Sequence, residues 1–344
     1  MFARSLTAAV LGAAIALPAL LQPAAARTAA QTAYPLTLQN CGVSLTFDRA
    51  PESAVTVGQA ATEVLYSLGL ADRVKGTAVW FTPVLPEFAE ANAKVERLAD
   101  NDPSFESVVA KRPGLVAVQY EWHVGPQGIV ATREQFADLG IPTYILPADC
   151  AGKDNSTGSD GTRTAMFTME GVYRGVTELS QIFDVPAKGE ELVASLKARE
   201  AAAIEKARAL DLKEASAVFW FSSAEIDIDP YVAGRKGPPG YMMEALGLRN
   251  VIESDEEWPT VGWETIARAN PSVIVIARMD RRRFAADDYE KKLEFLRTDP
   301  VASQMDAVRN GRIVILDAHS MDPSIRNVTA LETLAEALPK FGLK

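Results

Sequence analysis

The sequence is poor in the side chains that most often carry out catalysis. Its 344 residues include only two histidines and two cysteines. It contains no Gly-x-Ser-x-Gly elbow, no phosphate-binding loop, no Gly-x-Gly-x-x-Gly after the first predicted strand and no His-Glu-x-x-His. With so few histidines and cysteines, a catalytic triad or a zinc hydrolase site is not expected, so the sequence favours a binding protein over an enzyme. We expect no catalytic residue, no cofactor and no resident metal.

Basic charge is also scarce. Lysine and arginine number 35 against 45 aspartates and glutamates, which gives a net charge of −10. An acidic protein is a poor candidate for binding nucleic acid or anionic lipid, because like charges repel. We therefore expect neither nucleic acid nor a lipid surface among its partners.

The apolar run at residues 6–21 is short for a membrane span. It follows Arg4 and precedes Pro-Ala-Ala-Ala at 23–26, which is the pattern of a secretory signal peptide. We expect residues 1–26 to be removed by cleavage after about Ala26. No cysteine stands directly after the run, so a lipid anchor is not indicated. The mature chain is predicted to be an exported, soluble monomer.

The cysteines Cys41 and Cys150 both lie in the mature chain. An exported protein meets an oxidising compartment, so we expect one disulfide between them. In the chain-entropy model, a disulfide that closes a loop of about a hundred residues stabilises the folded state by about 4.7 kcal/mol. The alternative is two free thiols that serve as metal ligands. A disulfide would place both cysteines in one N-terminal lobe that reaches at least to Cys150.

Residues 186–212 are rich in Ala, Leu, Glu, Lys and Arg and predict one long helix. Its apolar residues form a narrow stripe at Leu192, Leu196, Ala203, Ala207 and Leu210. On either side, short apolar strands alternate with helices, which predicts parallel sheets covered on both faces. In this reading residues 86–99 are helical.

The two halves also resemble each other in sequence. Residues 104–118 align with residues 262–276 at a constant offset, which pairs Glu106 with Glu264 and Pro113 with Pro271. The fold prediction is therefore two Rossmann-like α/β lobes with parallel sheets, joined by a single long rigid helix. The N-terminal lobe spans residues 33–185, the linking helix 186–212 and the C-terminal lobe 213–344.

Ligands of open α/β sheets bind beyond the carboxyl ends of the strands. Aromatic side chains gather at these positions, which suits a bulky apolar ligand, although each of them could instead pack against a loop. Arg278 would suit a carboxylate or catecholate, unless it forms a salt bridge, while residues 281–283 are predicted to be a solvated loop. The candidate ligand-binding residues are Gln59, Trp80, Phe81, Tyr120, Trp122, His123, Trp220, Tyr231, Arg278, His319 and Met321.

The two histidines, His123 and His319, fall one in each half. Together they could ligate a metal or a haem between the lobes. The more ordinary interpretation is that each is a hydrogen-bonded residue of the cleft.

Several segments resemble the periplasmic substrate-binding proteins of ABC importers for iron–siderophore complexes, haem and cobalamin. The resemblance covers nearly the whole mature chain. The matching segments are Gly-Gln-Ala-Ala-Thr-Glu at 58–63, Leu-Gly-Leu at 68–70, Gly-Thr-Ala at 76–78, Phe-Glu at 105–106, Pro-Gly-Leu-Val at 113–116, Leu-Gly-Ile-Pro at 139–142 and Ser-Ile-Arg-Asn-Val at 324–328.

The resemblance implies a periplasmic protein with two lobes that close only slightly on a ligand. It also implies that one surface glutamate on each lobe, Glu106 and Glu264 here, docks on arginines of the inner-membrane permease. The hypothesis is a carrier for a metal chelate, most simply a ferric siderophore. Haem or cobalamin is the alternative cargo, and a secreted two-domain α/β enzyme is the alternative of another class.

Overall fold

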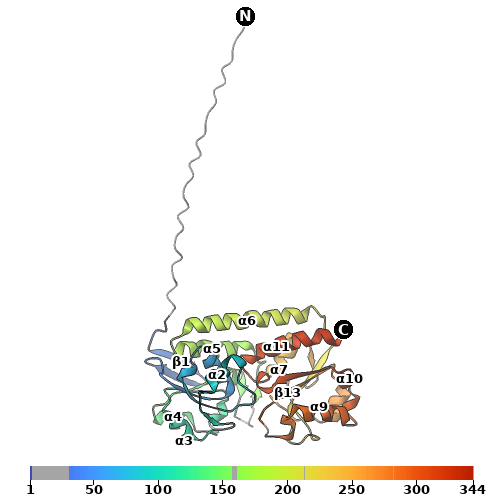
Figure 1. Cartoon of the computed structure of the whole chain (residues 1–344), viewed down its shortest axis with the longest axis horizontal. Coiled ribbons are helices and arrows are strands. Elements are labelled where there is room, and N and C mark those ends of the chain that lie inside the picture. The colour runs from blue at the N-terminus through green and yellow to red at the C-terminus, as the bar shows by residue number, and fades with distance from the viewer. Residues whose placement is uncertain (2–30, 157–160, 213, 282, 344) are drawn as a thin grey trace.

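The computed structural model describes residue 1 and residues 31–343, except 157–160, 213 and 282. The predicted signal peptide and its cleavage site therefore lie outside the described residues, apart from Met1. The chain forms two α/β halves side by side, with the long helix α6 (Pro186–Arg208) lying along both (Figure 1). In the described part of the chain, no helix has the length and hydrophobicity needed to span a bilayer.

The N-terminal lobe is built on a five-stranded parallel sheet, as predicted. The strand order is β5-β4-β3-β6-β7. Strands β3, β6 and β7 are fully buried, because helices cover both faces. The sheet strands are β3 (Ala54–Val57), β4 (Val74–Ala78), β5 (Arg97–Ala99), β6 (Val116–Val118) and β7 (Thr143–Ile145).

Among the described residues, two hairpins, five α-helices and several short 3-10 helices complete this lobe. The helices are α1 (Gln59–Ser67), α2 (Ala89–Asn92), α3 (Phe105–Val109), α4 (Arg133–Asp138) and α5 (Met169–Ile182). The hairpin strands are β1 (Leu36–Asn40) with β2 (Val43–Phe47), and β8 (Lys153–Asp154) with β9 (Thr162–Arg163). The disulfide between Cys41 and Cys150 is present, so that prediction is confirmed.

The helix predicted for residues 86–99 is wrong in its second half. The chain is helical only to Asn92, and β5 then pairs with β4 at the sheet edge. Leu98 packs directly against Gly76, where a side chain on β4 would collide with it. This tertiary contact outweighs the high helix propensity of Ala, Glu and Lys in the segment.

The C-terminal lobe has a second five-stranded sheet with the order β11-β10-β13-β14, and β12 also pairs with β10. Its pairs are parallel, as predicted, except that β11 runs antiparallel to β10 at the edge of the sheet. The strands are β10 (Ser216–Ser222), β11 (Tyr231–Val232), β12 (Arg249–Asn250), β13 (Val273–Arg278) and β14 (Ile313–Asp317). The helices are α7 (Pro238–Ala245), α8 (Trp263–Ala269), α9 (Tyr289–Thr298), α10 (Asp306–Arg309) and α11 (Arg326–Ala337).

The paired segments of the two halves have the same structure. In the first, α3 precedes β6, and in the second, α8 precedes β13. Glu106 and Glu264 each lie in the first turn of their helix, where a carboxylate interacts favourably with the helix dipole. The sequence offset therefore reflects a structural repeat.

Helix α6 buries the predicted apolar stripe, with Leu196, Ala203 and Ala207 fully buried. Glu200 lies on the same face, where it accepts hydrogen bonds from Tyr173 on α5 and Tyr241 on α7. Burial and the Glu200 carboxylate raise the pKa of both phenols. One carboxylate of the linking helix thus holds a tyrosine from each lobe.

The two lobes share a continuous hydrophobic core. One cluster of buried residues includes Val57 and Phe81 from the first lobe together with Phe219 and Val275 from the second. Phe81 also meets Phe221 edge to face, with ring centroids 6.3 Å apart. The strand ends of the two sheets therefore face each other across a packed seam.

Candidate functional site

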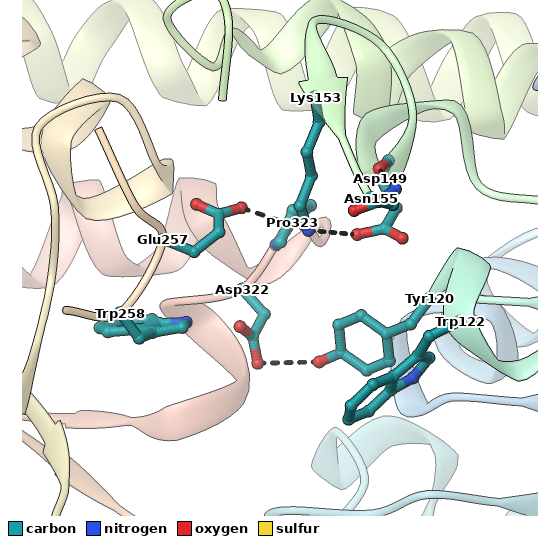
Figure 2. A pocket seen from close by; sticks show the side chains of 9 residues that line it. All are labelled: Tyr120, Trp122, Asp149, Lys153, Asn155, Glu257, Trp258, Asp322 and Pro323. Carbon is teal, nitrogen blue, oxygen red and sulfur yellow. Dashed lines mark hydrogen bonds and ion pairs between the residues drawn. The ribbon is translucent and has the colours of Figure 1, made fainter. Parts of the chain in front are cut away.

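A small pocket lies in the seam between the two lobes, with a volume of about 350 Å³ including its open mouth. Figure 2 shows its walls, with Trp258 on one side and Tyr120 and Trp122 on the other. The lining residues are Tyr120, Trp122, Asp149, Lys153 and Asn155 from the first lobe and Glu257, Trp258, Asp322 and Pro323 from the second. The site thus requires both halves of the chain, as predicted.

Tyr120 and Asp322 bridge the pocket. The tyrosine hydroxyl donates to Oδ2 of Asp322 at 3.0 Å, between the two aromatic walls (Figure 2). Trp258 is fixed from behind by Phe221, whose ring centroid lies 4.6 Å from its own. The pocket therefore offers flat aromatic faces with a few polar groups between them, a usual composition for small-molecule sites.

An ion-pair network closes the inner side of the pocket. Nζ of Lys153 lies 2.8 Å from Asp149 and 3.6 Å from Glu257, which also pairs with Arg163 at 2.9 Å. Burial disfavours the charge of Lys153, but the two carboxylates outweigh it and raise its pKa. Because Glu257 belongs to the second lobe and its two cations to the first, this network also ties the lobes together (Figure 2).

Two of the N-terminal candidates do not face the pocket. Gln59 is buried and is held by both ends of its amide: its nitrogen donates to Glu63, and its oxygen accepts from the backbone of Phe81. Trp80 is buried beneath Arg97, and its indole donates to Thr77. Neither residue lines the pocket, because their polar atoms form hydrogen bonds within the lobe.

His123 is a hydrogen-bonded residue, as the more ordinary interpretation held. The indole N–H of Trp122 donates to its Nδ1 at 3.1 Å, and its Nε2 lies 2.9 Å from Asp102. Since Nδ1 accepts, Nε2 carries the proton and donates to Asp102. The hydrogen bond from His123 in turn lowers the pKa of Asp102. His123 thus orients the Trp122 wall and does not itself line the pocket.

His319 is fully buried in the seam, and its ring stacks on Phe81 with centroids 6.3 Å apart. Neither ring nitrogen has a hydrogen-bond partner in the described part of the chain. Burial, followed by the nearby charge of Arg326, holds its pKa well below the usual value. The two histidines have different neighbours: His123 packs with Tyr120 and Trp122, and His319 packs with Phe81.

In the second lobe, the sequence does not show which face of a strand each candidate side chain lies on. Trp220 is completely buried against Trp263 and Phe295, on the face of β10 opposite to Phe221. Met321 is buried in the shared core. Neither residue faces the pocket, and Tyr231 instead contacts Phe284 at the outer edge of the sheet.

Arg278 forms a salt bridge with Asp317 and lines a separate groove with Ile315 and Arg326. It is therefore not placed to bind a ligand in the aromatic pocket. The loop that follows was predicted to be solvated. Arg283 is exposed, and residue 282 lies outside the described residues, but Arg281 is half-buried and reaches Phe81 and Asn101 of the other lobe. The seam thus contains an arginine at a position different from the predicted one.

The sequence analysis missed most of the polar lining. Asp149 and Lys153 flank the predicted disulfide, and Glu257, Trp258 and Asp322 lie in loops without a recognisable motif. The available signal was Trp258, a tryptophan that was not among the candidate residues. Of the predicted residues, Tyr120 and Trp122 line the pocket.

Comparison with known proteins agrees with this architecture. Residues 55–319 match the model of a periplasmic binding protein family. An uncharacterised ABC transporter substrate-binding lipoprotein, YvrC of Bacillus subtilis, is 24% identical over 308 residues, which is 89% of this chain and 86% of that protein. A vitamin B12-binding protein of Vibrio campbellii is 26% identical over 65% of this chain and 70% of its own length.

A solved structure is similar over almost its full length. The ABC-type Fe3+-hydroxamate transport system protein of Saccharomonospora viridis is 27% identical, with a TM-score of 0.71, and the match covers 89% of this chain and 99% of that chain. The family match spans well over half of the sequence, and the two-lobed α/β architecture with its interlobe pocket agrees with it. The chain therefore belongs to the periplasmic binding protein family, whose members bind solutes.

Proposed function

We propose that the protein captures a metal chelate, most simply a ferric siderophore, between its lobes and delivers it to an ABC permease in the inner membrane. The observation that carries this proposal is the pocket itself, which takes aromatic walls from both lobes and is closed by Tyr120 and Asp322. The similar structure from S. viridis, named for Fe3+-hydroxamate transport, supports iron as the cargo metal.

The pocket is small in this closed arrangement, so a bulky chelate would need the lobes to separate. Opening would break the contacts that join the lobes at the pocket, which are those of Tyr120 with Asp322 and of Glu257 with Lys153 and Arg163. The hydrogen bonds of Glu200 on α6 with Tyr173 and Tyr241 involve no residue that lines the pocket. We infer a small hinge motion that opens the aromatic walls and leaves the α6 side in place.

A corrinoid is the second candidate cargo, because the relative from V. campbellii is named as a vitamin B12-binding protein. Haem is a third possibility within the same class. Absorbance spectra separate these cargoes, since a haem gives a Soret band and a corrinoid gives its own visible bands, whereas catecholate and hydroxamate iron complexes absorb differently.

Native mass spectrometry of the protein isolated from its own periplasm tests the proposal. The expected result is a mass increment equal to that of one iron chelate, with a protein mass that corresponds to a monomer cleaved after Ala26. An increment equal to a corrinoid or a haem would replace the siderophore with that cargo. Turnover of a co-purified organic substrate would instead favour the secreted enzyme.

A further inference from the structure

Trp122 forms one wall of the pocket, and the residue next to it holds it in place. The indole N–H donates to Nδ1 of His123 at 3.1 Å, and the two rings meet at an angle of 72° with their centroids 5.4 Å apart. The other ring nitrogen of His123 lies 2.9 Å from Asp102. The wall is therefore one end of a three-residue relay, Asp102–His123–Trp122, that runs from a partly exposed carboxylate to the pocket.

One arrangement of protons satisfies all three side chains of the relay. An indole N–H can only donate, and an ionised carboxylate can only accept. His123 must therefore be neutral, with its proton on Nε2 and the lone pair of Nδ1 facing Trp122. The hydrogen bond from His123 is the largest influence on Asp102 and lowers its pKa, which keeps the carboxylate ionised and the proton on Nε2.

Protonation of His123 would remove the acceptor on which the wall depends. A charged imidazole donates from both nitrogens, so its Nδ1–H would point at the indole N–H. Two donors that face each other with no acceptor between them are unfavourable. His123 is fully buried, and its carbonyl accepts from the backbone of Val130 and Ala131 at 3.0 and 3.3 Å, whereas Trp122 is half-buried. The side chain that can move away is therefore Trp122.

The other groups around the His123 ring act on its charge in both directions. Asp102 and Glu121, the latter on the same short helix, favour a positive ring, whereas Arg283 of the second lobe, which helps to lower the pKa of Asp102, opposes it. Tyr120, whose ring centroid lies 5.9 Å away, is of a residue type that is uncharged below about pH 10. Of these neighbours, only the tryptophan both lines the pocket and loses a hydrogen bond when the ring becomes charged.

We propose that Asp102 and His123 are positioning residues that make cargo binding dependent on pH. The neutral ring holds Trp122 as a wall for the cargo, and the protonated ring releases it, so affinity falls as the pH decreases. This inference rests on the proposed function, because it assumes that the cargo packs on Trp122. The release of the tryptophan itself does not depend on which cargo is carried.

Nuclear magnetic resonance of the empty protein tests the release of Trp122. Protein labelled with nitrogen-15 gives an indole N–H signal for each tryptophan, and the signal that is missing from Trp122→Phe identifies the wall. We expect this signal to shift as the pH is lowered from about 8 to about 5, the range in which histidine side chains ordinarily titrate. His123→Gln should abolish the shift, because an amide can accept from Trp122 and donate to Asp102 but takes up no proton. The chain has only two histidines, so His319→Gln is the matched control and should keep the shift.

Cargo binding is measured on the same variants with ferrichrome, an uncharged ferric trihydroxamate. Its dissociation constant, obtained from quenching of tryptophan fluorescence, should be at least tenfold larger at pH 5.5 than at pH 7.5 in the wild type and in His319→Gln. In His123→Gln and in Trp122→Phe the ratio should be below threefold. Lys292, whose pKa of about 7 lies in the same range, is controlled by Lys292→Met, which should keep the wild-type ratio.

A Trp122 signal that stays in place across this pH range, or a shift that persists in His123→Gln, would overturn the inference. Binding by the wild type that is equally tight at both pH values would also overturn it, as would a pH dependence that survives in His123→Gln. A wild type that shows the shift but binds neither ferrichrome nor any other iron chelate would overturn the proposed function, and with it the role in cargo binding, while the release of Trp122 would stand.

Discussion

Arg326 on α11 and Glu63 on α1 form an ion pair across the two lobes, with Nε 2.8 Å from Oε2. The side chains are only 5% and 0% exposed. Removing one partner of such a pair leaves an uncompensated buried charge, which typically costs about 3–5 kcal/mol. Arg326→Ala is therefore expected to lower the free energy of unfolding by about that amount, as measured by urea denaturation.

The control is Arg199→Ala, which removes an ion pair with Glu332 between α6 and α11. These side chains are 43% and 35% exposed, so the expected loss is at most about 1 kcal/mol. A double variant, Glu63→Leu with Arg326→Leu, should recover part of the loss, because it leaves no charge unpaired. Similar losses for Arg326→Ala and Arg199→Ala would show that the cross-lobe pair has no special role.

Lys292 on α9 supports the second lobe at the ends of two strands. Its buried Nζ donates to the carbonyl of Ala277 at 2.9 Å and to that of Phe221. Burial lowers the pKa of Lys292 to about 7, against an ordinary value of about 10.4. Between these two values the unfolded chain holds a proton that the folded chain has released, so the contribution of Lys292 to stability increases with pH.

Urea denaturation between pH 6 and 10 checks that the contribution of Lys292 to stability increases with pH. The free energy of unfolding of the wild type, minus that of Lys292→Met, should rise by up to about 1.4 kcal/mol per pH unit above pH 7. Below pH 7 the difference should be flat, because Lys292 is charged in both states. Parallel pH profiles of the two proteins would mean that the buried amine stays charged throughout.

Much of the fold could be predicted because the hydrophobic period and the amino-acid composition of a segment can be read from that segment alone. The α6 helix, the disulfide and the repeat that relates Glu106 to Glu264 follow from patterns that the chain carries in itself. The edge strand β5 could not be predicted, because it depends on the fit of Leu98 against Gly76 of a neighbouring strand.

The site was predicted less well than the fold, for a reason visible in β10. Trp220 and Phe221 are adjacent aromatics at a strand end, and only the register decides which one faces the seam. The same holds for Arg278 and Arg281: the first pairs with Asp317, while the loop turns the second into the other lobe. Contacts between lobes depend on how two units meet, which no single stretch of sequence encodes.

The disulfide between Cys41 and Cys150 fastens the hairpin β1–β2 to the loop that lines the pocket. Asp149, the neighbour of Cys150, accepts from the backbone of Glu121 at 2.6 Å and pairs with Lys153. Cys41→Ala with Cys150→Ala should lower the free energy of unfolding by about 2–5 kcal/mol. Urea denaturation with and without a reductant measures the loss.

The reductant supplies the control for this prediction. The reduced wild type should approach the stability of the double variant, and the double variant itself should not respond to reductant. A double variant as stable as the oxidised wild type would show that the bridge adds nothing to the folded lobe.

Glu106 and Glu264 are both exposed and lie at equivalent points of the two lobes, on α3 and α8. A permease that carries arginines could pair with both at once, and two such contacts on one rigid body reinforce each other. Changing both glutamates to arginine reverses the charge at each point and adds repulsion. We expect Glu106→Arg with Glu264→Arg to reduce uptake of iron chelate by cells at least tenfold, while the dissociation constant of the purified protein stays within threefold of the wild type.

The matched control reverses two exposed glutamates that are not related by the repeat, Glu134 on α4 and Glu290 on α9. This variant carries the same net charge as the docking variant, so it tests whether total charge alone affects transport. Loss of uptake in the control to the same extent would refute a specific two-point docking surface. Each single variant, Glu106→Arg or Glu264→Arg, should lose less uptake than the pair, because one of the two contacts remains.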